Sequence, residues 1–365
     1  MTARSERPPR ATLVDVALAA QVSRQTVSNV LNNPGKVSPQ TMAKVLFEIN
    51  RLNFLPNLAA RSLRQRKANA LGIELNATGG RRLGNIQDSF LVELTIAARG
   101  RDAHIITFAV EDYRQPIAEY KRLLATQMVS GFVLTNTRHD DPRPGWLREH
   151  DVPFVSFGQV WDDPGFTAWA DVDGGAGIAA GVRHLVGQGY GPIGYLGWPH
   201  GSPVGDDRRG GWVAATTQLG ILDPALQELP PAGIPAAAGA VQSLVARVGV
   251  GGAIVCASDT LAVAAYQVMR DQGLRPGIDI GLMGFDDTDS AEALGLTSVR
   301  QPLADIAPRL LSYLAAADSD SGPPAHGAVF DPVVIARQST DRSGRTDIPA
   351  ISTPAGNRTH DGDSP

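Results

Sequence analysis

The spacing of apolar and polar positions over residues 12–52 predicts three short helices. Thr12 can cap the first, which covers residues 12–20, because its hydroxyl can accept a hydrogen bond from a backbone N–H one turn later. After a tight turn, Ser23 caps a second helix, and Ser38 with the proline that follows it begins a third. Two short helices joined by a tight turn, with a third beside them, are typical of a helix-turn-helix unit.

The apolar residues of these helices can pack together and leave one polar face free. The predicted inward positions are Val16, Ala17, Ala20, Val22, Val27, Val30, Leu31, Val45, Leu46, Ile49 and Leu52. The other side of the second helix carries Arg24, Gln25, Thr26, Ser28 and Asn29. Side chains of this kind can bind base edges, so this face suits the major groove of DNA. The alternative is a small helical bundle that binds no nucleic acid.

Beyond residue 68, short apolar runs alternate with helical segments. The runs predict buried parallel strands at residues 70–75, 105–108, 131–135, 152–157, 193–196, 253–257 and 280–285. Helices are predicted near residues 176–186, 211–219, 241–248 and 261–272. This regular order of strand and helix predicts an α/β region built on parallel sheets.

The distribution of charge divides the chain in the same place. Residues 1–68 hold 11 Lys and Arg against 3 Asp and Glu, a net charge of +8, whereas the remaining residues hold 22 against 34, a net charge of −12. A basic module attracts phosphates, and an acidic body avoids non-specific wrapping on nucleic acid. The charges therefore favour DNA binding by the helical segment over a bundle without such a role.

Composition excludes several classes of protein. The single cysteine, Cys256, rules out an intramolecular disulfide and a multi-cysteine metal site, as expected in a reducing compartment. No apolar run follows residues 1–10 as in a signal peptide, and none reaches the roughly 18 residues needed to span a bilayer. We therefore expect a cytoplasmic protein that does not associate with membranes.

Catalysis finds little support in the motifs. The chain has no Gly-x-Ser-x-Gly elbow and no His-Glu-x-x-His, and its seven histidines show no metal-ligand spacing. The Gly-Gly-Ala-Gly run at residues 174–177 lacks the spacing and the lysine of a phosphate-binding loop. We therefore expect neither an enzyme nor a cofactor.

Four short motifs in the basic segment closely resemble the lactose-repressor (LacI) family of transcriptional regulators. They are Thr-Leu-Val-Asp-Val-Ala from residue 12, Val-Ser-Arg-Gln-Thr-Val-Ser from residue 22, Leu-Asn at residues 31–32, and Pro-Asn-Leu-Ala-Ala-Arg-Ser-Leu at residues 56–63. The resemblance implies that the second helix reads bases and that residues 57–68 hold a hinge helix and linker. The implied DNA-binding residues are Thr12, Ser23, Arg24, Gln25, Thr26, Ser28, Asn29, Asn32, Asn57, Ala60 and Leu63, with Leu63 wedged between central base pairs.

The family pattern also implies the organisation of the whole chain. A disordered arm (1–10) precedes the helix-turn-helix domain (11–56) and the hinge (57–68), and a ligand-binding core (69–340) precedes a disordered tail (341–365). The implied core is periplasmic-binding-protein-like, with two doubly wound parallel-sheet lobes. Lobe 1 is expected at about 69–167 and 297–329, and lobe 2 at about 168–296 and 330–340. The chain is expected to cross between them near residues 166–169, 296–300 and 330.

The same resemblance implies an effector site in the cleft between the lobes. Its expected residues are Asn76, Trp161, Trp169, Arg208, Ser258 and Asp286, with Trp198 also near the cleft. Charged donors and acceptors suit the hydroxyl groups of polyols, and a tryptophan can stack on the apolar face of a pyranose. The implied effector is a mono- or oligosaccharide that releases DNA. A purine-like corepressor is the alternative.

Two residues depart from the family pattern. The family commonly has Gly or Asn where this chain has Gln21, so Gln21 is expected to adopt a left-handed backbone conformation. It commonly has Arg where this chain has Asn29, and Asn cannot form the two-pronged contact of Arg with guanine, so a different operator is expected.

A palindromic operator requires two reading helices, so we expect a homodimer joined through the α/β core. The tail from residue 339 is rich in Thr, Asp, Gly and Pro and has no leucine heptad, which argues against a tetramer. The remaining alternative, an exported sugar-binding protein, has no use for a basic helix-turn-helix segment.

Overall fold

The computed structural model describes residues 11–52, 54, 69–75, 86–110, 116–231, 234–317 and 326–343. They fall into two compact units, one within residues 1–68 and one within residues 69–365. The predicted arm (1–10), the hinge and linker (57–68) and all but three residues of the predicted tail (341–365) lie outside the described residues.

The first unit contains the three predicted helices. They are α1 (Leu13–Ala19), α2 (Arg24–Asn32) and α3 (Pro39–Arg51), with a 3-10 turn, η1 (Pro34–Lys36), before the third. The hydroxyls of Thr12, Ser23 and Ser38 cap these helices, as the sequence predicts. Gln21, between the first two helices, has φ 54°, so the left-handed conformation predicted at this position is confirmed.

The three helices enclose a small apolar core. Val16, Val27 and Val45 are fully buried in it, one from each helix, and Phe54 closes it from beyond α3. The prediction that Leu46 points inward is wrong, because this side chain is 44% exposed. The buried stripe of α3 follows Val45 with the partly buried Ile49 and Leu52, and Leu46 lies about 100° around the helix from Val45.

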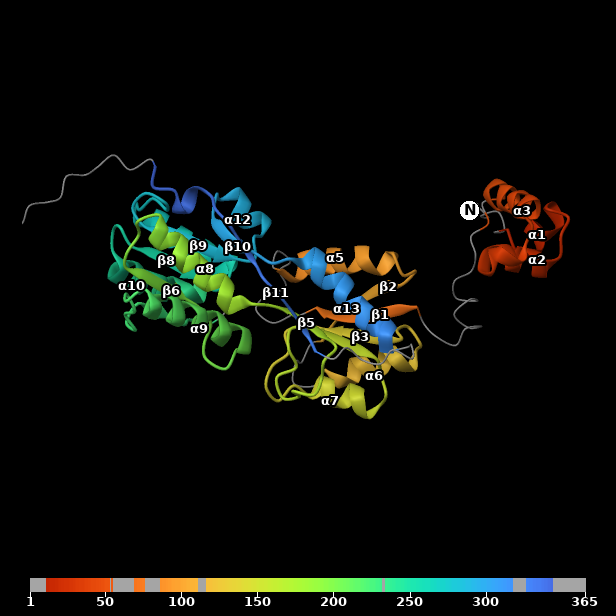
Figure 1. Cartoon of the computed structure of the whole chain (residues 1–365), viewed down its shortest axis with the longest axis horizontal. Coiled ribbons are helices and arrows are strands. Elements are labelled where there is room, and N and C mark those ends of the chain that lie inside the picture. Colours follow the sequence, from red (N-terminus) through yellow and green to blue (C-terminus); the bar gives the residue numbers. More distant parts are fainter. Residues whose placement is uncertain are drawn as a thin grey trace, which may run out of the picture. The chain divides into compact units, whose positions relative to one another are not determined.

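The second unit holds two six-stranded sheets (Figure 1). The first has the order β11-β5-β4-β3-β1-β2 and comprises β1 (Ala70–Leu75), β2 (His104–Ala109), β3 (Gly131–Leu134), β4 (Phe154–Phe157), β5 (Trp169–Val172) and β11 (Ala328–Phe330). The second has the order β12-β10-β9-β8-β6-β7 and comprises β6 (Ile193–Leu196), β7 (Gln227–Glu228), β8 (Ala253–Cys256), β9 (Gly281–Phe285), β10 (Thr297–Arg300) and β12 (Val333–Ile335). All strand pairs are parallel except β10 with β12.

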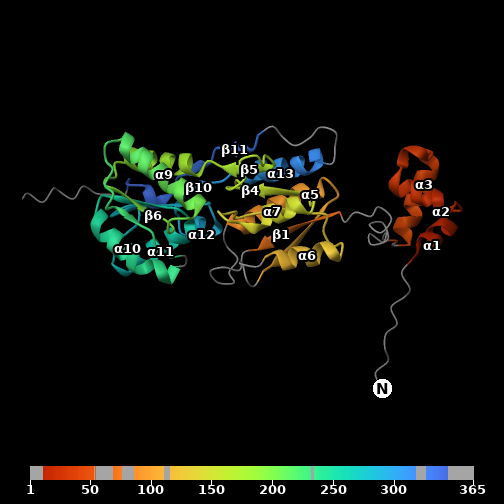
Figure 2. The ribbon, with the colours of Figure 1, turned by 90° about the horizontal axis from the view of Figure 1, so that it is seen from below.

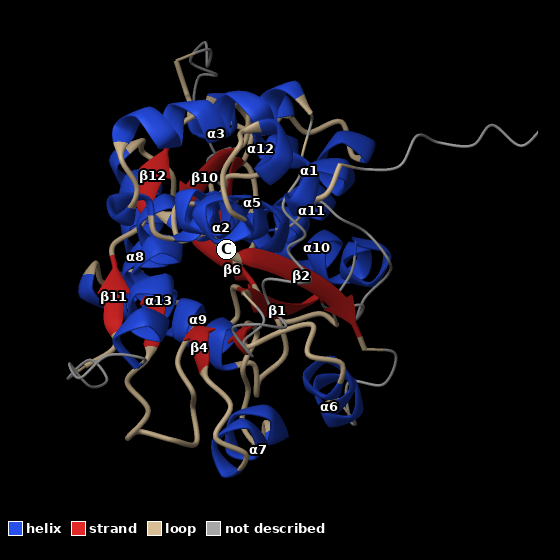
Figure 3. Cartoon of the chain, turned by 90° about the vertical axis from the view of Figure 1, so that its right-hand side faces the viewer, coloured by secondary structure: helices blue, strands red, loops and turns tan. Residues whose placement is uncertain are grey.

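Helices cover both faces of each sheet (Figures 2 and 3). Those of the first lobe are α5 (Ile86–Arg99) and α13 (Leu303–Ala317) on one face and α6 (Ile117–Ala125) and α7 (Pro142–Glu149) on the other. In the second lobe, α8 (Gly174–Gly187) packs with α9 (Pro203–Gln218), and α10 (Ile234–Val248) packs with α11 (Asp259–Asp271). Two short helices, α12 (Asp289–Ala293) and η2 (Gln338–Thr340), complete that lobe. The predicted pair of doubly wound lobes is confirmed.

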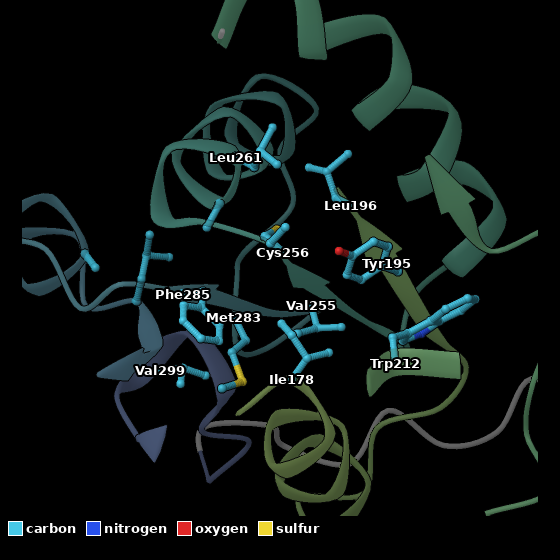
Figure 4. Close-up of a cluster of buried hydrophobic side chains, with 14 of the residues drawn as sticks. Ile178, Tyr195, Leu196, Trp212, Val255, Cys256, Leu261, Met283, Phe285 and Val299 are labelled. Carbon is cyan, nitrogen blue, oxygen red and sulfur yellow. The ribbon is translucent and has the colours of Figure 1, made fainter. Parts of the chain in front are cut away.

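Continuous apolar strands explain why the second sheet is buried on both faces. All four residues of β6 and β8 are buried, and so are all five of β9. Figure 4 shows the resulting core, in which Ile178 of α8 and Trp212 of α9 lie against side chains of these strands. The indole N–H of Trp212 donates to the carbonyl of Ile193, so the largest core side chain carries no unpaired polar group.

The chain crosses between the lobes three times, and the crossings fall later than predicted. The first lies at Asp173, between β5 and α8, the second at residues 301–302, between β10 and α13, and the third at residues 331–332, between β11 and β12. The predicted lobe boundaries at residues 168 and 297 are therefore wrong. Trp169 begins β5, which pairs with β4 of the first sheet, and Thr297 begins β10, which pairs with β9 of the second sheet. Each strand therefore belongs to the lobe that precedes the crossing.

Candidate functional site

Helix α2 presents the polar face that the sequence predicts for DNA contact. Arg24 and Gln25 are exposed on it, while Val27 and Val30 are buried on the opposite side. The side-chain amide of Gln25 donates to the Oδ1 atom of Asn29 at 3.2 Å, one helical turn away. This bond orients the Gln25 amide. The neighbouring Arg24 side chain is exposed and does not belong to the apolar core of the three helices.

Some predicted DNA-binding side chains also hold the helices together. The Thr12 hydroxyl and backbone N–H both lie 2.7 Å from an Asp15 carboxylate oxygen, and these hydrogen bonds lower the pKa of Asp15. The Ser23 oxygen accepts from the backbone N–H of Thr26 at 3.0 Å and lies 2.9 Å from its hydroxyl. These residues set where α1 and α2 begin. Of the other predicted residues, Ser28 is partly buried and Asn32 ends α2, while Asn57, Ala60 and Leu63 lie outside the described residues.

A second group of polar residues gathers at the carboxyl ends of the strands in the second lobe. Trp198 follows β6, Ser258 follows β8 and Asp286 follows β9. Neighbouring parallel strands end at the same edge of a sheet, so residues far apart in sequence meet there. Helix α9 adds Arg208 to this group.

The Arg208 guanidinium is the centre of this group. Its side chain is only 7% exposed, and its Nη1 atom donates to the carbonyl of Ala257 at 2.5 Å. Its Cζ atom lies 3.7 Å from the ring centroid of Phe285 and 5.5 Å from that of Trp198. The Nε atom is buried and has no hydrogen-bond partner, so one donor of this cation is left unsatisfied.

Close packing of α8 against α9 places this arginine. A Cβ atom at Gly211 would lie 2.1 Å from the carbonyl oxygen of Gly175, so no side chain fits at this point of contact. Ser202 caps α9 and Pro203 occupies its first turn, which fixes where the helix begins. Arg208 consequently lies on the buried side of α9.

Asp286 provides the opposite charge. Its Oδ1 atom lies 3.7 Å from Nη1 of Arg208 and accepts a 2.7 Å hydrogen bond from the Gln301 amide. Burial raises the pKa of Asp286 to about 7, against the lowering effect of the Arg208 charge. Its backbone has φ 115°, a conformation that costs a non-glycine residue free energy and is found mostly at functional positions.

Asp171 in the first lobe was missed by the sequence analysis as a site residue. It lies near the end of β5, and its carboxylate accepts from the backbone N–H groups of Val172 at 2.8 Å and Gln159 at 3.2 Å. Burial raises its pKa to about 6, and the positive charge of Arg208 opposes this rise. A carboxylate within the otherwise uncharged strand Trp-Ala-Asp-Val was the available signal.

The other predicted effector residues lie in different settings. The Ser258 hydroxyl caps α11 by accepting from the N–H of Leu261 at 3.3 Å. Trp169 begins β5, and its ring lies where a Cβ atom of Gly327 would be, at the end of the strand away from the carboxyl edge. Trp161 lies in the loop after β4, and its buried indole N–H has no partner. Asn76 lies outside the described residues.

Two family profiles match this chain. The profile described as "Bacterial regulatory proteins, lacI family" matches residues 12–57, and that of a "Periplasmic binding protein-like domain" matches residues 182–340. The HTH-type transcriptional regulator CelR of Thermobifida fusca is 30% identical over 305 residues, which cover 81% of this chain and 88% of CelR. The chain belongs to the lacI family of bacterial regulatory proteins.

Further comparisons agree with this membership in the lacI family. GalR of Escherichia coli K12, another HTH-type transcriptional regulator, is 28% identical over 90% of this chain and 95% of its own. The structure of a CelR–cellobiose complex has a TM-score of 0.66 at 26% identity and covers 90% of this chain and all of the other. A lac repressor dimer bound to operator and an anti-inducer has a TM-score of 0.73 over 91% of this chain, and at 23% identity it shows the shared fold.

This lacI-family protein is a DNA-binding transcriptional regulator, and the relatives named above are regulators rather than enzymes. Helix α2 lies within the part matched by the family's DNA-binding profile, and Arg208 and Asp286 lie within the part matched by the ligand-binding one. Within the described ranges, each helix is too short or too polar to traverse a lipid bilayer.

Proposed function

We propose that this regulator is a cytoplasmic repressor that leaves a palindromic operator when a sugar binds between its two lobes. The observation that carries the proposal is the Arg208 guanidinium, which is buried beside the Asp286 carboxylate and keeps one unpaired donor. Buried charged groups of both signs can bind the hydroxyls of a polyol as acceptors and as donors. Trp198, 5.5 Å from the same guanidinium, offers an aromatic face of the kind on which sugar rings stack.

We propose that Asp171 extends this site to the first lobe. Since Asp171 belongs to the first sheet and Arg208 to the second lobe, a ligand between them touches both lobes. A ligand can favour one arrangement of the lobes only if it binds the two arrangements with different affinity. The related CelR protein in complex with cellobiose supports a saccharide as the ligand class.

A thermal-shift series on the full-length protein tests the ligand class. Cellobiose, D-galactose, D-ribose and hypoxanthine serve as probes, because a ligand of the native state raises the melting temperature by mass action. We expect a rise with at least one sugar, and the same sugar should release a bound operator duplex in a gel-shift titration. A rise with hypoxanthine alone, together with tighter operator binding, contradicts the proposal and favours a purine corepressor.

Arg24 and Gln25 are proposed to set the half-site preference. Once a duplex has been selected from a random pool with the wild-type protein, Arg24→Ala and Gln25→Ala should each weaken binding about tenfold to a hundredfold and relax preference at one base pair. Lys44→Ala on α3, also an exposed site, serves as the control and should leave base preference unchanged. Equal base preference in all four proteins, measured by competition gel shift, contradicts this assignment.

We also propose that the regulator is a homodimer whose contact surface includes α5. Val92 and Ile96 lie one helical turn apart on this helix and are 58% and 61% exposed. Ile96→Glu should therefore shift the protein from dimer to monomer in sedimentation equilibrium and weaken operator binding at least tenfold, because single heads cannot span a palindrome. Val250→Glu, at a position 62% exposed in the second lobe, is the matched control. A dimer that survives Ile96→Glu disproves the role of α5.

A further inference from the structure

Asp287, the residue after Asp286, makes contacts outside the proposed ligand site. Asp287 has a side chain only 5% exposed, and its Oδ2 atom accepts from Nε of Arg300 at 2.6 Å. Its Oδ1 atom lies 2.7 Å from Nη1 of Arg337, an ion pair in which the N–H does not point at the oxygen. One buried carboxylate therefore holds two arginines.

These two arginines belong to the segments that run to and from the first lobe. Arg300 ends β10 and directly precedes the second crossing, whereas Arg337 follows β12, the strand that the chain enters after the third crossing. Arg337 is itself fixed to the second lobe, because its backbone N–H donates to the Thr297 hydroxyl at 2.8 Å. Asp287 thus contacts the segment that leads into the second crossing and the segment that follows the third.

The backbone around Asp287 is held in a strained turn. Asp286 and Asp287 have φ values of 115° and 54°, so two successive non-glycine residues occupy the left-handed side of the conformational map. The N–H of Asp286 donates to the carbonyl of Val299 at 2.8 Å, and that of Asp287 donates to the Ser298 hydroxyl at 2.9 Å. Both residues of the turn are therefore anchored to β10.

We propose that Asp287 is a positioning residue that transmits occupancy of the Arg208–Asp286 site to the second and third crossings. This inference rests on the proposed function, in which an effector engages Asp286. Gln301, within the second crossing, reaches the same turn by donating to Asp286 at 2.7 Å. An effector that draws on Asp286 changes the Gln301 contact directly and the Arg300 and Arg337 contacts through Asp287. The dipeptide Asp286-Asp287 thereby controls the contacts of both the second and the third crossing.

Hydrogen–deuterium exchange on the full-length protein tests this assignment without operator or sugar. Asp287→Asn keeps the shape of the side chain and removes its charge. Since a hydrogen bond to a charged group contributes on the order of tenfold or more to a local equilibrium, peptides covering residues 300–303 and 331–337 should exchange about tenfold faster. Peptides from β6 and β8 should keep their wild-type rates. Wild-type rates at both crossings, or equal acceleration in β6 and β8, overturn the proposal.

Three companion variants separate positioning from general loss of stability. Glu228→Gln removes the Arg247 ion pair of the same lobe, away from the crossings, and should leave both crossing peptides unchanged. Arg300→Gln alters a side chain that is 57% exposed, so it should fold normally and accelerate exchange at the second crossing only. Asp287→Glu should restore part of the protection at both crossings.

A double-variant comparison tests transmission itself. Arg208→Lys perturbs the ligand site, and in the wild-type background it should change exchange at the two crossings. In the Asp287→Asn background the same substitution should change it at least threefold less, because the connecting contact is lost. Equal changes in both backgrounds overturn the proposal. Failure of the operator or sugar experiments leaves this result unaffected, so the two proposals can fail separately.

Discussion

Arg208→Met is expected to abolish the response to the effector while leaving binding of the free protein to its operator unchanged. The substitution removes a charge-assisted donor that no neighbouring side chain can replace. It also leaves the Asp286 carboxylate buried without its counter-charge, 3.7 Å away in the wild type. Charge-assisted hydrogen bonds contribute roughly 1.5–3 kcal/mol each, so the Kd for the sugar that stabilises the wild type should rise about tenfold to a hundredfold.

Isothermal titration with that sugar measures the loss in the Arg208→Met variant, and a gel-shift titration measures operator binding. Arg209→Met is the matched control, because it removes a guanidinium from the neighbouring position, where Nε donates to the Gln227 side chain of β7 at 2.7 Å. The control should bind the sugar as the wild type does. Sugar binding by Arg208→Met within threefold of the wild type contradicts the assignment of the site.

Asp286→Asn is expected to stabilise the folded protein above pH 7 while weakening sugar binding. Burial raises the folded-state pKa of Asp286 to about 7 from an ordinary value of 3.8, so between these values the folded state binds more protons than the unfolded state. Stability of the wild type therefore falls as pH rises from about 4 to about 7, and the full cost is present above pH 7. Asparagine carries no charge at any pH and does not incur this cost.

Thermal unfolding of Asp286→Asn and the wild type at pH 5 and pH 8 measures this difference. The advantage of the variant should be larger at pH 8. Asp171, whose pKa burial raises to about 6, adds a smaller decline of the same sign in both proteins, and it saturates by about pH 7. Asp279→Asn, at a carboxylate that pairs with an exposed Arg275, serves as the control. An equal gain in melting temperature for Asp286→Asn at pH 5 and pH 8 contradicts the claim that Asp286 carries a buried charge above pH 7.

Apolar periodicity predicted seven strands and four helices of the second unit, but it gave no range for the helices α5, α6, α7 and α13 or for the strands β5 and β10. The strand predicted at residues 70–75 matches β1, and those at 193–196 and 280–285 match β6 and β9 to within one residue. The last two are continuous apolar runs, which a strand buried on both faces requires, and β1 is apolar except at Glu74. The start of α9 was missed by two turns, because its first residues, Pro-Val-Gly-Asp-Asp, carry no apolar stripe and the helix depends there on the Ser202 cap.

Short edge strands and lobe boundaries could not be derived from pattern alone. β7 has two residues and β11 and β12 have three, too few to show a period, and they are strands only because a neighbouring strand supplies their hydrogen bonds. The lobe to which a strand belongs is likewise decided by pairing, which explains the misplacement of Thr297.

Some residues of the candidate site could be predicted from sequence motifs, whereas the positions of others are known only from the structure. Family motifs identified Arg208 and Asp286, and the structure brings these two within 3.7 Å of each other. Trp169 was selected for its aromatic ring, and only the register of β5 with β11 shows that it lies at the far end of its strand. Asp287 carried no signal like the lone carboxylate in the strand of Asp171, and the roles of both residues depend on which chain segments pass beside them.

The three crossings also affect the order in which the chain can fold during synthesis. The second lobe receives nearly all its sequence in one run, from α8 to β10, and of its described elements only β12 and η2 come later. The first lobe emerges from the ribosome earlier, yet it lacks α13, which covers β4 and β5, until residue 317 has been made. Domains generally fold as units while they are being translated. The first lobe is therefore synthesised first, but it can complete its fold only after α13 has been made.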